Sequence, residues 1–281
     1  LPKVARTASH LFEFMTAVRE LRGFGRGLRD AIADWYLEKP TDKLAYQMVK
    51  YRGRSGWTHR DALRVAHPRD AERDGLFRWA VNKPQADDAG PLPSIIEGFE
   101  AARTAPVSEV PALVRRWGLT HEMVPTAALK DPATLAALLE RMPLGALVRF
   151  LGRLSAAGVL ILVPDAESSI VARLTDAEAL RAARLHPMAL LVALRTYASG
   201  GGLRGSLSWI PSARIIDALN EAFHLAFQNV APSGKRHLLA LDVSGSMDHH
   251  RCAGATALTC AEAAAALTLV TARVEQHAFT M

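Results

Sequence analysis

Residues 237–247 read HLLALDVSGSM, and at this point the character of the chain changes. The almost continuous apolar run from His237 to Val243 is typical of a strand that is buried on both faces of a parallel sheet. A Ser/Gly loop follows it, and the apolar segment from about Thr256 to Val274 then predicts a helix. Strand, polar loop and helix in this order predict the beginning of a doubly wound α/β domain.

A boundary precedes this strand at Pro232-Ser233-Gly234. The sequence therefore predicts two domains, residues 1–232 and residues 233–281. An open sheet of the doubly wound kind needs more strands than residues 233–281 can supply. Because the chain also begins with Leu1 rather than Met, we expect the second domain to be truncated and the sequence to be part of a longer chain.

Residues 1–232 predict a succession of amphipathic helices. Residues 9–22 place Leu11, Phe12, Met15, Val18 and Leu21 at helical spacing. Capping boxes are predicted at Thr58 with Asp61 and at Thr175 with Glu178, and Pro- and Gly-containing loops at 82–93 and 199–205. Many helices with short loops and no strand between them favour an α-solenoid. The further helices are predicted at 28–38, 41–51, 59–66, 72–81, 93–103, 107–117, 132–141, 143–157, 176–184, 187–198 and 212–227.

The composition is that of a globular protein, with 49% hydrophobic and 22% charged residues. No apolar run reaches the roughly 18 residues that a membrane span needs. The two cysteines, Cys252 and Cys260, do not make a disulfide scaffold. We therefore expect a cytoplasmic protein without a membrane partner.

Positive charge is concentrated near the beginning of the chain. Residues 19–69 contain twelve Lys or Arg and six Asp or Glu, so this segment carries the whole net charge of +6. A concentrated basic segment indicates a polyanionic partner, most often nucleic acid. A solvated helix surface with internal ion pairs is the alternative.

Arg22, Arg26 and Arg29 stand at i, i+4 and i+7, which on one helix would form a stripe suited to phosphates. The glycines between them favour a loop or close helix packing instead. Pairing with Glu20, Asp30 or Asp34 is a further alternative.

A second basic run contains Lys50, Arg54, His59, Arg60 and Arg64, interleaved with Tyr46, Tyr51 and Trp57. The cations can bind phosphates and the aromatic rings can stack on unpaired bases, although the rings are more typical of a core.

A candidate metal site follows the predicted strand. Asp242, Ser244 and Ser246 offer hard oxygen ligands of the kind that Mg²⁺ prefers, at the strand end where open α/β sheets bind ligands. A turn that caps the next helix is the alternative. His249, His250 and Cys252 lack the second ligand pair that zinc sites show. No nucleophile elbow is visible, so we expect no enzyme activity.

Four long strings together resemble the TROVE family, the family of the Ro 60 kDa autoantigen and its bacterial orthologue Rsr, from about Ser9 to the end. The strings are LRGFGRGLRDAIADWY (21–36), LAYQMVKYRGRSGWTHRDALRVAHP (44–68), RLHPMALLVALRTYASGGGLRGSLSW (184–209) and LLALDVSGSM (238–247). The resemblance implies a mainly α fold, in which a ring of HEAT-like helical repeats is closed by an α/β von Willebrand factor A domain. It implies a metal-ion-dependent adhesion site at Asp242, Ser244 and Ser246.

The resemblance also implies the partners. In this family Y RNAs, which are small noncoding RNAs, bind the outer surface of the ring, and 3′ ends of misfolded RNA enter its hole. Residue by residue, the Y RNA contacts fall on Lys50, Arg54 and His67, to which the local charge adds Arg22, Arg26, Arg29, Arg60 and Arg64. We expect an RNA-binding scaffold for RNA quality control, with an exoribonuclease tethered through RNA and no DNA partner. The alternative is a protein-interaction scaffold whose metal grips a partner carboxylate.

Overall fold

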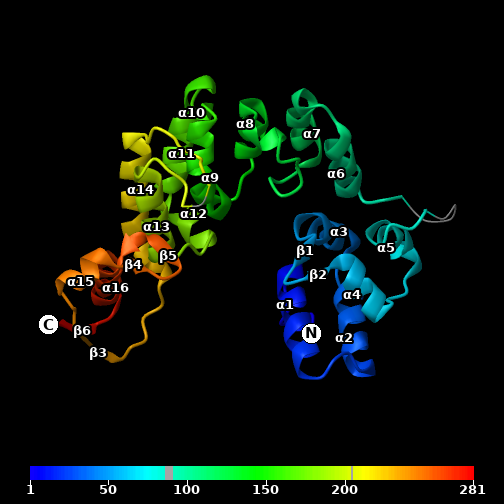
Figure 1. The fold of residues 1–281 in the computed structure, drawn as a ribbon, viewed down its shortest axis with the longest axis horizontal. Coiled ribbons are helices and arrows are strands. Elements are labelled where there is room, and N and C mark those ends of the chain that lie inside the picture. Colours follow the sequence, from blue (N-terminus) through cyan, green and yellow to red (C-terminus); the bar gives the residue numbers. More distant parts are fainter. Residues whose placement is uncertain (86–90, 204) are drawn as a thin grey trace. The chain divides into compact units, whose positions relative to one another are not determined.

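The computed structural model describes residues 1–85, 91–203 and 205–281. The described chain divides into two compact units, Leu1–Leu138 and Leu139–Met281 (Figure 1). Parts of both predicted loops, 82–93 and 199–205, lie outside the described residues. No helix in the described ranges is both long and apolar enough to cross a membrane.

The first unit consists mainly of helices. Its core holds Phe12, Met15, Trp35 and Tyr36, all fully buried. Leu21 was predicted to share the apolar face of its helix but is 83% exposed, because the helix ends at this residue and no neighbour covers its last turn. The elements are α1 (Ala8–Leu21), α2 (Arg26–Leu37), α3 (Thr41–Lys50), β1 (Gly53–Arg54), β2 (Trp57–Thr58), α4 (His59–Ala66), α5 (Asp74–Ala80), α6 (Ser94–Thr104), α7 (Val110–Trp117) and α8 (Pro132–Leu139).

Helix α4 begins and ends where the sequence predicts. The predicted capping box is present, since the Asp61 backbone N–H donates to Thr58 Oγ1 and the Thr58 N–H donates to Asp61 Oδ2. His67 ends the helix in the left-handed conformation, with φ 48° and ψ 48°, and its N–H donates to the Leu63 carbonyl at 2.9 Å. Both ends of this short helix are therefore fixed by hydrogen bonds.

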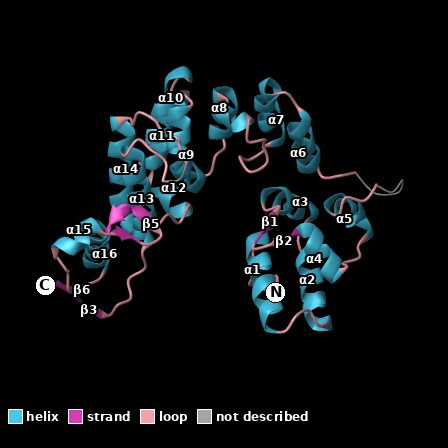
Figure 2. Cartoon of the chain, in the orientation of Figure 1, coloured by secondary structure: helices cyan, strands magenta, loops and turns pink. Residues whose placement is uncertain are grey.

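The second unit contains the remaining helices and the α/β elements (Figure 2). Strands β3 and β6 pair in parallel, from Arg236 opposite His277 to Leu239 opposite Thr280. Arg195 of α13 and Glu262 of α16 form an ion pair at 2.8 Å, which joins the helical and the α/β elements. The elements are α9 (Leu144–Ala156), α10 (Val159–Leu162), α11 (Ala166–Leu174), α12 (Ala177–Ala182), α13 (Pro187–Ala198), α14 (Ala213–Leu225), β3 (Arg236–Leu239), α15 (Gly245–His249), β4 (Arg251–Cys252), β5 (Ala255–Thr259), α16 (Cys260–Val274) and β6 (His277–Thr280).

The predicted fold class, mainly α followed by the beginning of an α/β domain, is confirmed. Besides Leu21, several local predictions were wrong. No strand was predicted among the helices of the first unit, yet β1 and β2 pair there as a hairpin. The predicted strand is not buried on both faces, since Leu238 is 69% exposed in a sheet of two strands. Residues 255–259 form β5, and the helix begins only at Cys260, where Thr259 and Glu262 supply a capping box. The cap predicted at Thr175 belongs to Asp176, whose carboxylate accepts from two backbone N–H groups.

Candidate nucleic-acid interface

Helix α4 presents a stripe of cations to solvent. Arg60 and Arg64 stand at i and i+4, so they share one face of the helix, and His67 follows directly at its C-terminal cap. All three are exposed. The helix packs into the first unit through its buried residues His59, Ala62 and Leu63. The amphipathic pattern of α4 therefore places Arg60 and Arg64 together at the surface, and His67 lines the same pocket.

A pocket of about 530 Å³ lies beside this stripe. Its basic lining comprises Arg60, Arg64, Arg69 and Lys83 together with His67, and no Asp or Glu is among the described residues that line it. Across the described chain, none of these five side chains makes a hydrogen bond or an ion pair. Because no carboxylate in the described residues pairs with these Lys and Arg side chains, the pocket should attract anions.

The pocket also has an apolar side, formed by Leu63, Phe77 and Val81. Leu63 and Phe77 belong to the core of the first unit, at 5% and 9% exposure. The pocket therefore combines basic side chains with apolar side chains that belong to the core of the first unit.

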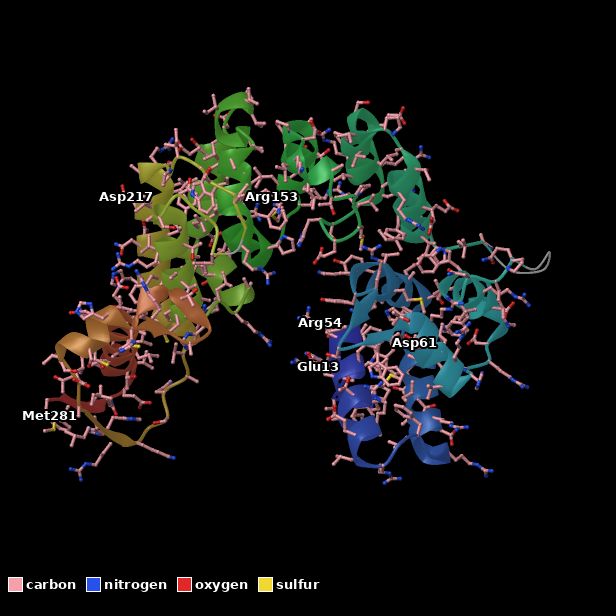
Figure 3. The ribbon with its side chains drawn as sticks, viewed as in Figure 1. Glu13, Arg54, Asp61, Arg153, Asp217 and Met281 are labelled. Atoms are coloured by element: carbon pink, nitrogen blue, oxygen red, sulfur yellow. The ribbon has the colours of Figure 1, made fainter. Side chains whose placement is uncertain are left out.

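The β1–β2 hairpin carries Arg54 to the surface. Its two turn residues, Ser55 and Gly56, have φ angles of 52° and 76°, as a two-residue type I′ turn requires. Thr16 Oγ1 donates to the Ser55 carbonyl at 3.1 Å and ties the turn to α1. Arg54 is exposed, and it is labelled at the surface of the first unit in Figure 3. Opposite it in the hairpin, Trp57 is 8% exposed.

Lys50 ends α3 and is half-buried among aromatic rings. Its Nζ donates to Tyr46 Oη at 3.3 Å and lies 5.3 Å and 5.5 Å from the Tyr46 and Tyr51 ring centres. Burial lowers the pKa of the ammonium group, but the hydrogen bond to Tyr46 and the charges of Tyr46, Tyr51 and Glu122 raise the pKa above its usual value. Lys50 therefore stays positively charged at neutral pH.

Lys50, Arg54 and His67 flank one helix. Lys50 and Arg54 precede α4, which begins at His59, and His67 follows its last turn. An eight-residue helix is about 12 Å long, so the basic side chains extend over a distance of several phosphates. Their role in RNA binding stays a prediction.

The single stripe considered for Arg22, Arg26 and Arg29 does not form. Arg22 follows the end of α1 and Arg26 begins α2. Gly23 lies between them in a loop with φ +72°, and a Cβ on Gly23, Gly25 or Gly27 would meet nothing within 4 Å, so these glycines do not serve close packing. Arg29 Nε donates to the Phe24 carbonyl at 3.1 Å. Within the described residues, no ion pair joins these arginines to Glu20, Asp30 or Asp34.

His59 belongs to the core and not to the basic surface. It is 4% exposed, and its Nδ1 lies 2.9 Å from the Tyr36 hydroxyl. Burial lowers its pKa to about 4, so the ring is neutral at neutral pH. Of the aromatic residues considered for stacking, Trp57 is buried, while Tyr46 and Tyr51 are half-buried beside Lys50.

The loop after β3 brings the three candidate metal ligands together. Asp242 Oδ1 accepts the Ser244 backbone N–H at 2.8 Å, and the hydroxyls of Ser244 and Ser246 lie 3.0 Å apart. The hydrogen bonds from Ser244 hold the pKa of Asp242 below its usual value. The described residues hold no group of three or more His, Cys, Asp or Glu that could bind a metal. One ionised carboxylate with two hydroxyls fits a hard cation such as Mg²⁺, which also retains waters.

Two cations of the pocket, Arg69 and Lys83, were missed from the sequence. Arg69 follows Pro68 just outside α4, and Lys83 follows α5. The spacing of Arg60, Arg64 and His67 could have indicated the stripe. No sequence signal places Lys83 beside it, because that position depends on how α5 packs against α4.

Comparison with known proteins identifies two family domains. The TROVE domain matches residues 2–88 and 115–196, and the Ro60 vWA domain matches residues 236–281. The RNA-binding protein RO60 of Deinococcus radiodurans is 41% identical over 285 residues, which cover 100% of this chain and 54% of that protein. The RNA-binding protein RO60 of Caenorhabditis elegans is 34% identical over 330 residues, which cover 96% of this chain and 51% of that protein.

The fold also matches a solved structure. The crystal structure of the Deinococcus radiodurans RO (RSR) protein matches with a TM-score of 0.87 and 41% identity. The match covers 100% of this chain and 57% of the other. The chain thus spans little more than half the length of the relatives that it matches.

Proposed function

Because this chain belongs to the TROVE domain family, we propose that it binds noncoding RNA through the basic face of its first unit. The residues assigned to RNA contact are those of the α4 stripe with its pocket, Lys50 and the hairpin residue Arg54. The RNAs are stem-loops of the Y RNA kind and misfolded RNAs with single-stranded 3′ ends. The protein acts as a scaffold in RNA quality control, and an exoribonuclease tethered through the RNA performs any processing.

The observation that carries this proposal is the set of four Lys and Arg side chains, with His67, that line one pocket without an ion pair among the described residues. The RNA backbone presents a row of phosphates, and Lys and Arg side chains that neutralise them release counterions. Exposed cations without protein partners lose no intramolecular ion pair when they bind phosphate. RNA binding should therefore weaken steeply as the salt concentration rises, and selectivity should follow RNA shape and not base sequence.

A second part of the proposal is a Mg²⁺ ion at the loop after β3. Asp242, Ser244 and Ser246 would hold it, and the ion would supply a positive charge that can bind an acidic group of a partner. Mg²⁺ titration followed by calorimetry tests this site. Binding that disappears in Asp242→Asn is expected, while a native protein that takes up no Mg²⁺ would contradict the site.

The RNA proposal is tested by a gel-shift assay over a range of salt concentrations. The native protein is compared with the triple variant Lys50→Ala/Arg54→Ala/His67→Ala, on a Y-like stem-loop and on a duplex with a single-stranded 3′ tail. We expect tight binding of both RNAs by the native protein and loss of stem-loop binding in the variant. A matched control, Arg103→Ala/Arg181→Ala, removes two exposed arginines that already pair with Glu100 and Glu178 and should bind like the native protein. Equal binding by the triple variant would refute the proposed site, and absence of native binding at moderate salt would favour a protein-interaction scaffold.

A further inference from the structure

We propose that the pocket beside α4 binds the terminal phosphate of an RNA strand, in preference to the phosphodiesters inside the strand. This inference rests on the proposed RNA-binding function and adds a ligand class for one part of its surface. It predicts that the protein distinguishes phosphorylated RNA ends from hydroxyl ends.

The first argument is the amount of charge. Arg60, Arg64, His67, Arg69 and Lys83 line one pocket of about 530 Å³. Two described carboxylates close to the α4 cations in sequence are engaged elsewhere, since Asp61 bonds to Thr58 and Asp70 pairs with Arg73. A phosphodiester carries one negative charge, whereas a terminal phosphate carries about 1.5 to 2 at neutral pH. Cations that converge on one pocket therefore suit a terminal phosphate, or a chain of phosphates, better than a single diester.

The second argument is the shape of the site. An internal phosphodiester has a sugar on each side, so it can enter a pocket only if the strand on both sides bends toward it. A strand end has a sugar on one side only. The apolar wall of Leu63, Phe77 and Val81 offers a surface against which that last sugar can pack. The exposed Arg54, outside the pocket, suits phosphates that follow one another along the strand.

The third argument is that the backbone beneath the cations is already fixed. The N–H of His67 bonds to the Leu63 carbonyl, and the capping box fixes the opposite end of α4. A site whose backbone is in place before binding loses less entropy when the ligand arrives. Arginine also binds phosphate oxygens in pairs of parallel hydrogen bonds, which are stronger than single ones.

The experiment uses one stem-loop RNA prepared with a 5′ hydroxyl, a 5′ monophosphate, a 5′ triphosphate, or a 3′ phosphate with a 5′ hydroxyl. Affinities for the whole chain are measured at constant salt, for the native protein and for Arg64→Gln/Arg69→Gln. We expect at least one phosphorylated end to bind about tenfold more tightly than the hydroxyl form, which is about 1.4 kcal/mol. The preference should disappear in the variant, and the 5′ and 3′ probes show which end the pocket takes.

Inorganic tripolyphosphate serves as a competitor that has the charge of a phosphate chain without the RNA. It should abolish the preference for phosphorylated ends at concentrations that leave binding of the hydroxyl RNA largely intact. Equal native affinity for all four RNAs would overturn the terminal-phosphate site but leave the RNA-binding proposal standing. A preference that persists in Arg64→Gln/Arg69→Gln would overturn the assignment to this pocket. Failure of the native protein to bind any of the RNAs would overturn both proposals.

Discussion

Removal of two cations from the α4 stripe should change the salt dependence of RNA binding by a calculable amount. Arg60 and Arg64 lie one turn apart, both are exposed, and neither has a protein partner in the described chain. The double variant Arg60→Gln/Arg64→Gln therefore loses no internal ion pair, and glutamine keeps a high helix propensity at both positions. The folded protein should be as stable as the native one, so any change in affinity reports on the RNA contact.

The magnitude follows from counterion release. Each phosphate contact with duplex contributes about 0.9 to the slope of log K against log salt. If both arginines contact phosphates, the slope should decrease by about 1.8, and the affinity at about 0.15 M salt should fall by about 30-fold. The loss should become smaller as the salt concentration rises, because both proteins lose electrostatic binding.

Fluorescence anisotropy with a labelled stem-loop, at five or more salt concentrations, measures both quantities. The control Arg103→Gln/Arg181→Gln removes the same charge from arginines that are paired with Glu100 and Glu178. It should leave the slope within experimental error of the native value. A stripe variant that shows the native slope, with a thermal unfolding curve like that of the native protein, would refute the argument that these cations contact phosphate.

Three further predictions concern stability and local structure. Burial lowers the pKa of His59 to about 4, so the unfolded state binds more protons than the folded state between pH 6.5 and 4. The free energy of unfolding should therefore fall by about 3 kcal/mol as the pH decreases through this window and stay constant above it. Urea denaturation of the native protein and of His59→Leu at several pH values checks this. A Cβ on Gly152 would lie 2.7 Å from the Trp209 ring, whereas the nearest atom to a Cβ on Gly145 is 3.6 Å away. Gly152→Ala should cost about 1–3 kcal/mol, while Gly145→Ala should stabilise slightly, because alanine has the higher helix propensity. A Gly152→Ala melting curve like that of Gly145→Ala would contradict the close contact. Gly56 has φ +76° and open space around it, so Gly56→Ala should cost about 1–2 kcal/mol of backbone strain alone, as thermal unfolding can measure; no loss would show that the turn readily adopts another conformation.

Local features of the chain were largely predictable from the sequence. The spacing of Leu11, Phe12 and Met15 predicted α1, and all three residues are buried. The Thr58–Asp61 capping box predicted the start of α4, and His67-Pro68 predicted its end. These features could be predicted because caps and amphipathic periodicity act over one or two helical turns. The same short range explains the error at Thr175, since Asp176 is also a good cap and stands one residue away.

Other features depended on contacts between distant segments. Arg22 and Arg26 have helical spacing in the sequence, but the loop at Gly23 places them at the ends of two different helices. His59 has basic neighbours in the sequence, yet it is buried against Tyr36 of another helix and is neutral.

The sequence by itself determined that the chain begins with helices, that an α/β segment follows, and that cations concentrate in residues 19–69. Only the tertiary structure decided which of those cations share a surface. Lys83 joins Arg60 and Arg64 because α5 and the residues after it pack beside α4. Periodicity and capping determine local structure through neighbours in the chain, whereas a pocket forms from side chains whose positions depend on the packing of the whole core.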